Sequence, residues 1–73
     1  MPKYSVVLFH STAHAIRGEK VLTQANFQIK MIPTPRQLSS DCGMALRFDQ
    51  HEEQAVAATL AGNKVPFASI HAI

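Results

Sequence analysis

Cys42 is the only cysteine of the chain, and its thiol is the strongest candidate for covalent chemistry in these 73 residues. A thiolate attacks electrophiles and accepts sulfur or selenium, so a reactive cysteine needs surroundings that favour negative charge. Arg36 is the nearest cation in sequence, and Ser39 and Ser40 supply hydroxyl donors. Gly43 permits the backbone angles that turn N–H groups inward as an anion-binding nest. These neighbours favour a reactive thiol at Cys42.

A buried, inert cysteine is the competing interpretation. Free cysteine often behaves as a small hydrophobic residue in protein cores. Asp41 would also raise the pKa of the neighbouring thiol if its carboxylate faced the same way. The residues around Cys42 are polar turn formers, however, which favours exposure of the thiol. The residues alone leave both interpretations open.

Histidines offer two further kinds of site. His10 and His14, together with Cys42, would give three zinc ligands, but an HEXXH pattern is absent and we expect surface or capping histidines and no metal. A Cys-His catalytic pair could join Cys42 to any of the histidines, and nothing selects one of His10, His14, His51 and His71. The sequence also lacks GxGxxG, P-loop, GxSxG and CxxC motifs, so we expect no cofactor.

The first half of the chain predicts a strand, a helix and a second strand. Residues 4–9 form an almost continuous apolar run typical of a central strand covered on both faces. Ser11 or Thr12 can cap a helix that reaches about residue 25, with Asn26 as a left-handed stop. Its buried face should consist of Ala15, Gly18, Leu22 and Ala25, where Gly18 would allow close approach to the sheet. Apolar and polar residues then alternate over 27–31, as in a strand with one solvated face.

The second half repeats the order strand, helix, strand. Pro33 and Pro35 stiffen the loop that contains Cys42, and alternation over 44–48 predicts the third strand. Asp49 and Glu52 resemble a capping box for a helix over 50–61, closed by Gly62. Its buried stripe should consist of Ala55, Ala58 or Thr59, and Leu60. Residues 65–72 read as a last strand, and Pro66 near its beginning indicates a sheet edge.

The order β-α-β-β-α-β predicts an α+β fold, a ferredoxin-like sandwich with a four-stranded antiparallel sheet and two helices on one face. We expect the second strand to end at the pole opposite the start of the first helix. Cys42 should then lie far from Ser11, unless its loop folds back across the sheet. The helix-free face also carries apolar residues, which predicts a homodimer through that face or through an edge strand.

Composition indicates one soluble domain over residues 1–73. The formal net charge is +2 at pH 7 and the basic residues are scattered, so we expect no nucleic-acid partner. No apolar stretch reaches the roughly 20 residues needed to cross a membrane. A lone thiol without an export signal indicates the cytoplasm.

The segment from Ile32 to Leu46 carries Pro33-Thr34-Pro35-Arg36, followed by Ser39-Ser40-Asp41-Cys42-Gly43. This combination resembles the signature of the selenium/sulfur (Se/S) carrier protein-like family, formerly a family of unknown function. The segment from Phe9 to Ala15, with Glu19 on the following helix, is similar to that family's junction between strand and helix. The resemblance covers nearly the whole chain.

The resemblance implies a cytoplasmic thiol carrier, and not an enzyme, that holds sulfur or selenium on Cys42 as a persulfide or perselenide. A desulfurase-type protein would donate the atom and an acceptor protein would take it. The residues implied to shape and polarise the loop are Pro33, Pro35, Arg36, Ser39, Ser40 and Gly43, with Ser11 as a neighbour. Two alternatives remain: a dimeric interaction or ligand-sensing module without catalysis, and a redox sensor that forms a disulfide between subunits.

Overall fold

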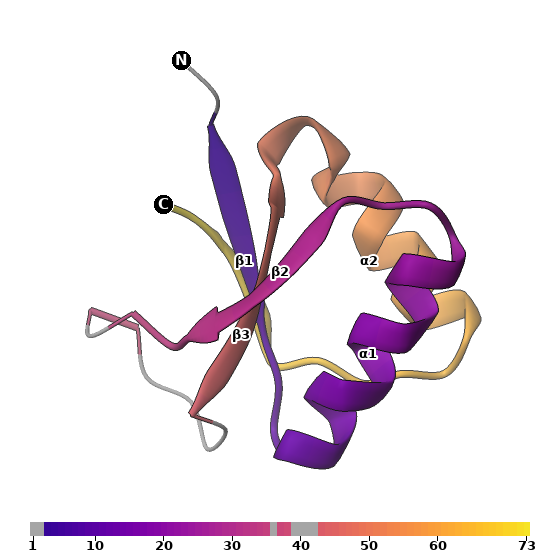
Figure 1. Cartoon of the computed structure of the whole chain (residues 1–73), viewed down its shortest axis with the longest axis horizontal. Helices are drawn as coiled ribbons and strands as arrows, with labels where there is room; N and C mark the ends of the chain where they lie inside the picture. Colours follow the sequence, from indigo (N-terminus) through magenta and orange to yellow (C-terminus); the bar gives the residue numbers. More distant parts are fainter. Residues whose placement is uncertain (1–2, 36, 39–42) are drawn as a thin grey trace.

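A four-stranded antiparallel sheet with two helices on one face forms the fold (Figure 1). The computed structural model describes residues 3–35, 37–38 and 43–73. The elements are β1 (Tyr4–Leu8), α1 (Thr12–Gln24), β2 (Ile29–Pro33), β3 (Met44–Asp49), the 3-10 turn η1 (Gln50–Glu52), α2 (Glu53–Gly62) and β4 (Ser69–Ala72). The strand order is β2-β3-β1-β4. The predicted ferredoxin-like α+β arrangement is confirmed.

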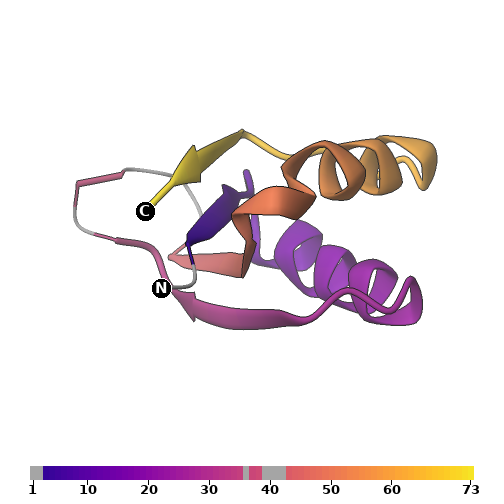
Figure 2. The same cartoon turned by 90° about the horizontal axis from the view of Figure 1, so that it is seen from above.

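The main core lies between the sheet and the two helices, which stand together on one side of it (Figure 2). From the sheet side, β1 and β3 supply buried residues at alternate positions, as the strand period of two requires. From the helix side, each helix buries only one face. The buried members of this core are Val7, Phe9, Ala15, Leu22, Leu46, Phe48, Val56, Leu60 and Val65.

The first helix follows its predicted pattern over three of the four positions. Ala15, Gly18 and Leu22 are buried as expected. Ala25 is exposed, because the helix ends at Gln24 and Ala25 is its C-cap, outside the last turn. Asn26 has a φ of 69°, which confirms the predicted left-handed stop.

Gly18 lies on the buried face of α1, beside the side chain of Phe9, the residue that follows β1. A Cβ atom built on Gly18 would stand 2.7 Å from Cζ of Phe9 and 3.5 Å from a methyl carbon of Leu60. Phe9 and Leu60 both belong to the core between the sheet and the helices. The predicted close approach is therefore confirmed, and its partner is the Phe9 ring.

The second helix departs from the sequence prediction in its start and its phase. Residues 50–52 form a 3-10 turn capped by Asp49, and the α-helix begins only at Glu53. Its buried residues are Val56 and Leu60, so the predicted stripe is wrong except at Leu60. Gly62 is the last helical residue, and Lys64 takes the left-handed conformation with a φ of 58°.

The strand bounds differ from those predicted: β2 lies two residues later than the predicted 27–31, β3 is one residue longer than the predicted 44–48, and β1 and β4 are shorter. The first strand ends at Leu8, although Phe9 is still buried, and the last begins at Ser69. β4 lies at an edge of the sheet, as Pro66 indicated. No helix within the described residues is long and apolar enough to span a membrane.

Candidate functional site

The segment that contains Cys42 leaves the sheet at the pole where α1 begins. β1 and β2 both pair antiparallel with β3, so they run parallel to each other and end at the same pole. Ser11 follows β1 at this pole, and Thr34 follows β2. The expectation that the loop and Ser11 lie at opposite poles is wrong, because β3 stands between the two parallel strands.

A backbone hydrogen bond closes the base of this loop. The Thr34 N–H donates to the Gly43 carbonyl over 3.0 Å, directly after the last strand pair, Pro33 with Met44. The Leu38 N–H donates to the Pro35 carbonyl over 3.0 Å, which is the hydrogen bond of a tight turn. The two proline residues thus stand at the end of β2 and at the start of this turn.

One described residue of the loop, Leu38, contacts the face of the sheet that carries no helix. Leu38 packs against a small cluster formed by Val6, Leu8 and Ala45. Figures 1 and 2 show the described residues 37 and 38 on the side of the sheet opposite the helices.

Several predicted site residues lie outside the described part of the chain. These are Arg36, Ser39, Ser40 and Cys42, together with Asp41. Gly43, which follows Cys42, is exposed, and a Cβ built on it would meet no atom within 4 Å. Pro33, Pro35, Gly43 and Ser11 are the predicted site residues that the structure describes, and all four lie at one pole of the sheet.

Ser11 has a structural role at this pole. Its side-chain oxygen accepts a hydrogen bond of 3.3 Å from the His14 N–H and caps α1. The Nδ1 atom of His14 is buried and has no hydrogen-bond partner among the described residues. Within that same part of the chain, no group of three His, Cys, Asp or Glu residues could hold a metal ion.

Two other histidines pair with residues two positions away in the sequence. His51 Nδ1 lies 2.9 Å from the Asp49 carboxylate, and its side chain is 87% exposed. The backbone N–H and the ring of His51 hydrogen-bond to this carboxylate, and both lower the pKa of Asp49. His71 Nε2 lies 2.8 Å from Ser69 Oγ on β4.

The helix-free face is less exposed than its sequence suggested. Val6, Leu8 and Ala45 are 0%, 1% and 0% exposed, and Ile32 and Leu38 pack against them. The expected homodimer rested on exposed apolar residues here, so this face gives it no support and the dimer stays a prediction.

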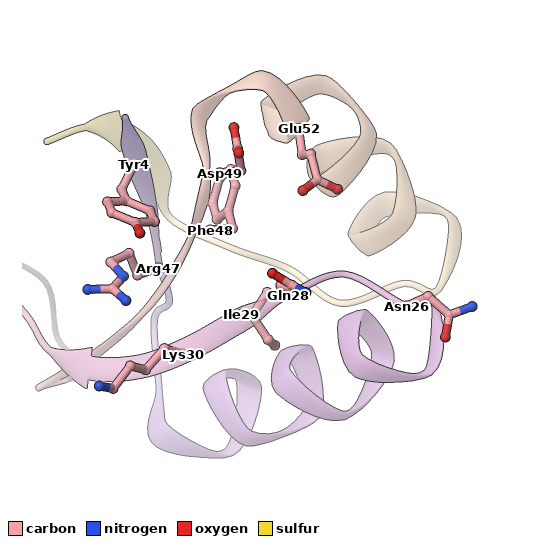
Figure 3. Close-up of a pocket in the computed structure, with 9 residues that line it drawn as sticks. All are labelled: Tyr4, Asn26, Gln28, Ile29, Lys30, Arg47, Phe48, Asp49 and Glu52. Carbon is pink, nitrogen blue, oxygen red and sulfur yellow. The ribbon is translucent and has the colours of Figure 1, made fainter. Parts of the chain in front are cut away.

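Two cations on this face were not singled out from the sequence. Lys30 and Arg47 are cross-strand partners on β2 and β3, and the Arg47 guanidinium lies 4.3 Å from the centre of the Tyr4 ring. All three residues line a cavity of about 590 Å³ at the pole opposite the Cys42 loop (Figure 3). The alternation predicted over 27–31 and 44–48 places Lys30 and Arg47 at polar positions of two strands. That placement is the sequence feature from which these two residues could have been identified.

Comparison with known proteins gives one match. No curated protein matches the chain, and no solved structure does. Residues 3–72 match a family described as "Putative Se/S carrier protein-like". Because this match spans almost all of the 73 residues, the chain belongs to that Se/S carrier protein-like family.

Proposed function

We propose that the protein carries sulfur or selenium on Cys42 as a persulfide or perselenide and passes it to an acceptor protein. One observation supports this most directly. The loop that contains the only cysteine is tied at its base, from Thr34 to Gly43, and its Leu38 is anchored on the sheet. A tied loop gives a partner protein a defined segment to engage.

Loading is an exchange between sulfur atoms and needs no external oxidant. The Cys42 thiolate attacks the outer sulfur of a donor persulfide, R–S–SH. A new S–S bond forms on Cys42, the S–S bond of the donor breaks, and the donor leaves as a thiolate. A perselenide donor reacts in the same way through its outer selenium. An acceptor nucleophile then attacks the outer atom, and the Cys42 thiolate leaves.

A chain with one cysteine suits a carrier. A second thiol in the same chain would attack the persulfide and discharge it as an internal disulfide. Cys42 has no such partner within the chain. The loaded state should therefore persist until an acceptor arrives.

The neighbours of Cys42 tune its thiolate in this proposal. Arg36 lowers the energy of the negative sulfur by charge, and Ser39, Ser40 and Ser11 supply hydroxyl donors. Gly43 gives the backbone freedom of an anion-binding nest, while Pro33 and Pro35 limit the motion of the loop. The donor is a desulfurase-type protein, and the exchange takes place in the cytoplasm.

Intact-mass spectrometry tests the proposal. The protein is incubated with a cysteine desulfurase and cysteine, or with selenite and a thiol, and the adduct is measured before and after reduction. We expect one or more added chalcogen atoms that a reductant removes, and no adduct on Cys42→Ser. No adduct on the wild type, or an equal adduct on Cys42→Ser, would exclude the carrier role.

The pH dependence of alkylation tests the tuning of the thiol separately. We expect Cys42 to react with iodoacetamide through a thiolate that forms well below the free-cysteine value of about 8.5. A titration at or above that value, with slow alkylation, would favour the interaction module in which Cys42 is merely packed.

A further inference from the structure

We propose that the helix-free face, through Lys30 and Arg47, docks an acidic surface of the protein that delivers the chalcogen atom. This inference rests on the carrier function proposed above. It adds the chemistry of the partner and the surface that recognises it.

Strand register gathers the two cations into one row across the sheet. Lys30 pairs with Arg47, Arg47 with Val6, and Val6 with His71. Side chains at directly paired positions point to the same face and lie about 5 Å apart at their Cβ atoms. Lys30 and Arg47 therefore form an adjacent pair of positive charges.

The same face continues toward the Cys42 loop. The next row on this face is Ile32, Ala45, Leu8 and Ser69, and Leu38 packs onto it. Two residues along a strand span about 7 Å, so the charged row stands roughly one row from the loop contact. A protein seated on Lys30 and Arg47 would therefore also cover the surface beside the loop.

Among the acidic residues that the structure describes, most lie on the other side of the sheet. Glu19, Glu52 and Glu53 belong to the helical layer, and Asp49 ends β3 and bonds to His51. Neither Lys30 nor Arg47 forms an ion pair within residues 3–35, 37–38 and 43–73. These cations are consequently available to carboxylates from outside the chain.

The cavity beside these cations gives the acidic side chains a place to enter. In Figure 3, Tyr4, Lys30 and Arg47 stand on one side of it and Glu52 on the helix side. Asp49 also lines the cavity. A carboxylate should therefore bind toward Lys30 and Arg47, away from the two acidic residues, which fixes the direction of approach.

The aromatic residues favour a protein partner over a nucleic acid. Single-stranded RNA binds such sheets by stacking its bases on exposed aromatic rings. The described Phe9, Phe27, Phe48 and Phe67 all pack in the helix-side core. Tyr4 is the remaining aromatic residue, and the Arg47 guanidinium covers its ring at 4.3 Å. Among the described Phe and Tyr residues, this face therefore offers no uncovered ring for stacking, and the ring of His71 on this face hydrogen-bonds to Ser69.

Charge reversal tests the docking surface by the rate of persulfide loading. The variant Lys30→Glu/Arg47→Glu is compared with wild type and with Lys20→Glu, a matched control on an exposed position of α1. The donor is a cysteine desulfurase with cysteine, at low and at high salt. We expect the double reversal to slow loading on the order of tenfold at low salt and to flatten its salt dependence, while Lys20→Glu loads like wild type.

Inorganic polysulfide serves as a second donor, because it reaches Cys42 without a protein surface. Equal polysulfide loading of all three proteins shows that the reversals leave the loop intact, and Lys30→Gln/Arg47→Gln replaces the reversal if that variant fails to fold. Loading by polysulfide, with equal desulfurase rates in all variants, overturns the docking proposal alone. Loading of wild type by polysulfide but not by the desulfurase overturns the docking proposal and the desulfurase-type donor. No loading by either donor overturns the carrier function as well. Binding of a single-stranded RNA that depends on Lys30 and Arg47 overturns the choice of a protein partner.

Discussion

The Thr34 N–H and the Gly43 carbonyl are joined by a hydrogen bond of 3.0 Å, which closes the loop that contains Cys42 at its base. Thr34→Pro removes this donor, and the preceding Pro33 already has the extended conformation of a strand. We expect the free energy of unfolding in urea to fall by about 1 kcal/mol relative to Thr34→Ala, which keeps the N–H. Equal stability of the two variants would show that the bond does not hold the loop.

Gly18 and the Phe9 ring leave no space for a side chain between them. Gly18→Ala would place a Cβ 2.7 Å from the ring, so we expect a loss of about 1–3 kcal/mol in unfolding free energy despite the better helix propensity of alanine. Gly62→Ala is the matched control, because its Cβ would meet nothing within 4 Å and the position is helical. That control should be neutral or stabilising in the same urea titration. Phe9→Leu in the Gly18→Ala background should restore part of the loss.

Much of the fold was predictable because local patterns determine it. The apolar run of residues 4–9 and the buried positions Ala15, Gly18 and Leu22 follow from periods that the backbone imposes. The phase of α2 was not predictable from the same rule. Three residues in a 3-10 turn advance the chain by a different angle from three in an α-helix, and the buried face moved from Ala55 to Val56.

The site depends on pairings that spacing does not encode. The loop begins at the same pole as Ser11 because β3 pairs antiparallel with both β1 and β2. These pairings connect residues that are distant in the sequence, so residue spacing does not reveal them. The pairing of Lys30 with Arg47 is set by the same register. Cys42 and its polar neighbours were recognised by residue type and by the family resemblance, and Arg36, Ser39, Ser40, Asp41 and Cys42 lie outside the described residues.

Asp49 should make the stability of the protein depend on acid pH. The His51 N–H and ring lower its pKa in the folded state, so the charged carboxylate stabilises the fold above the unfolded value of about 3.9. This contribution is lost as the pH falls through the lower folded value. We expect Asp49→Asn to flatten the acid limb of a stability profile measured by urea unfolding from pH 2 to 6. His51→Ala keeps the backbone donor and should flatten it only in part. An unchanged acid limb in Asp49→Asn would assign the limb to another carboxylate.

Ser11 can serve both the helix and the thiol, and two substitutions separate these roles. Its oxygen caps α1 by accepting from the His14 N–H, which leaves the hydroxyl proton free to be donated at the pole where the Cys42 loop begins. Ser11→Ala removes the cap and should cost about 1 kcal/mol of unfolding free energy, whereas Ser11→Asp keeps a capping oxygen and should restore most of it. The aspartate also replaces a donor by a negative charge, so the pKa of Cys42 in iodoacetamide alkylation should rise in Ser11→Asp if the thiolate lies nearby, as the carrier proposal requires. Restored stability with an unchanged alkylation profile would restrict Ser11 to capping and remove it from the proposed site.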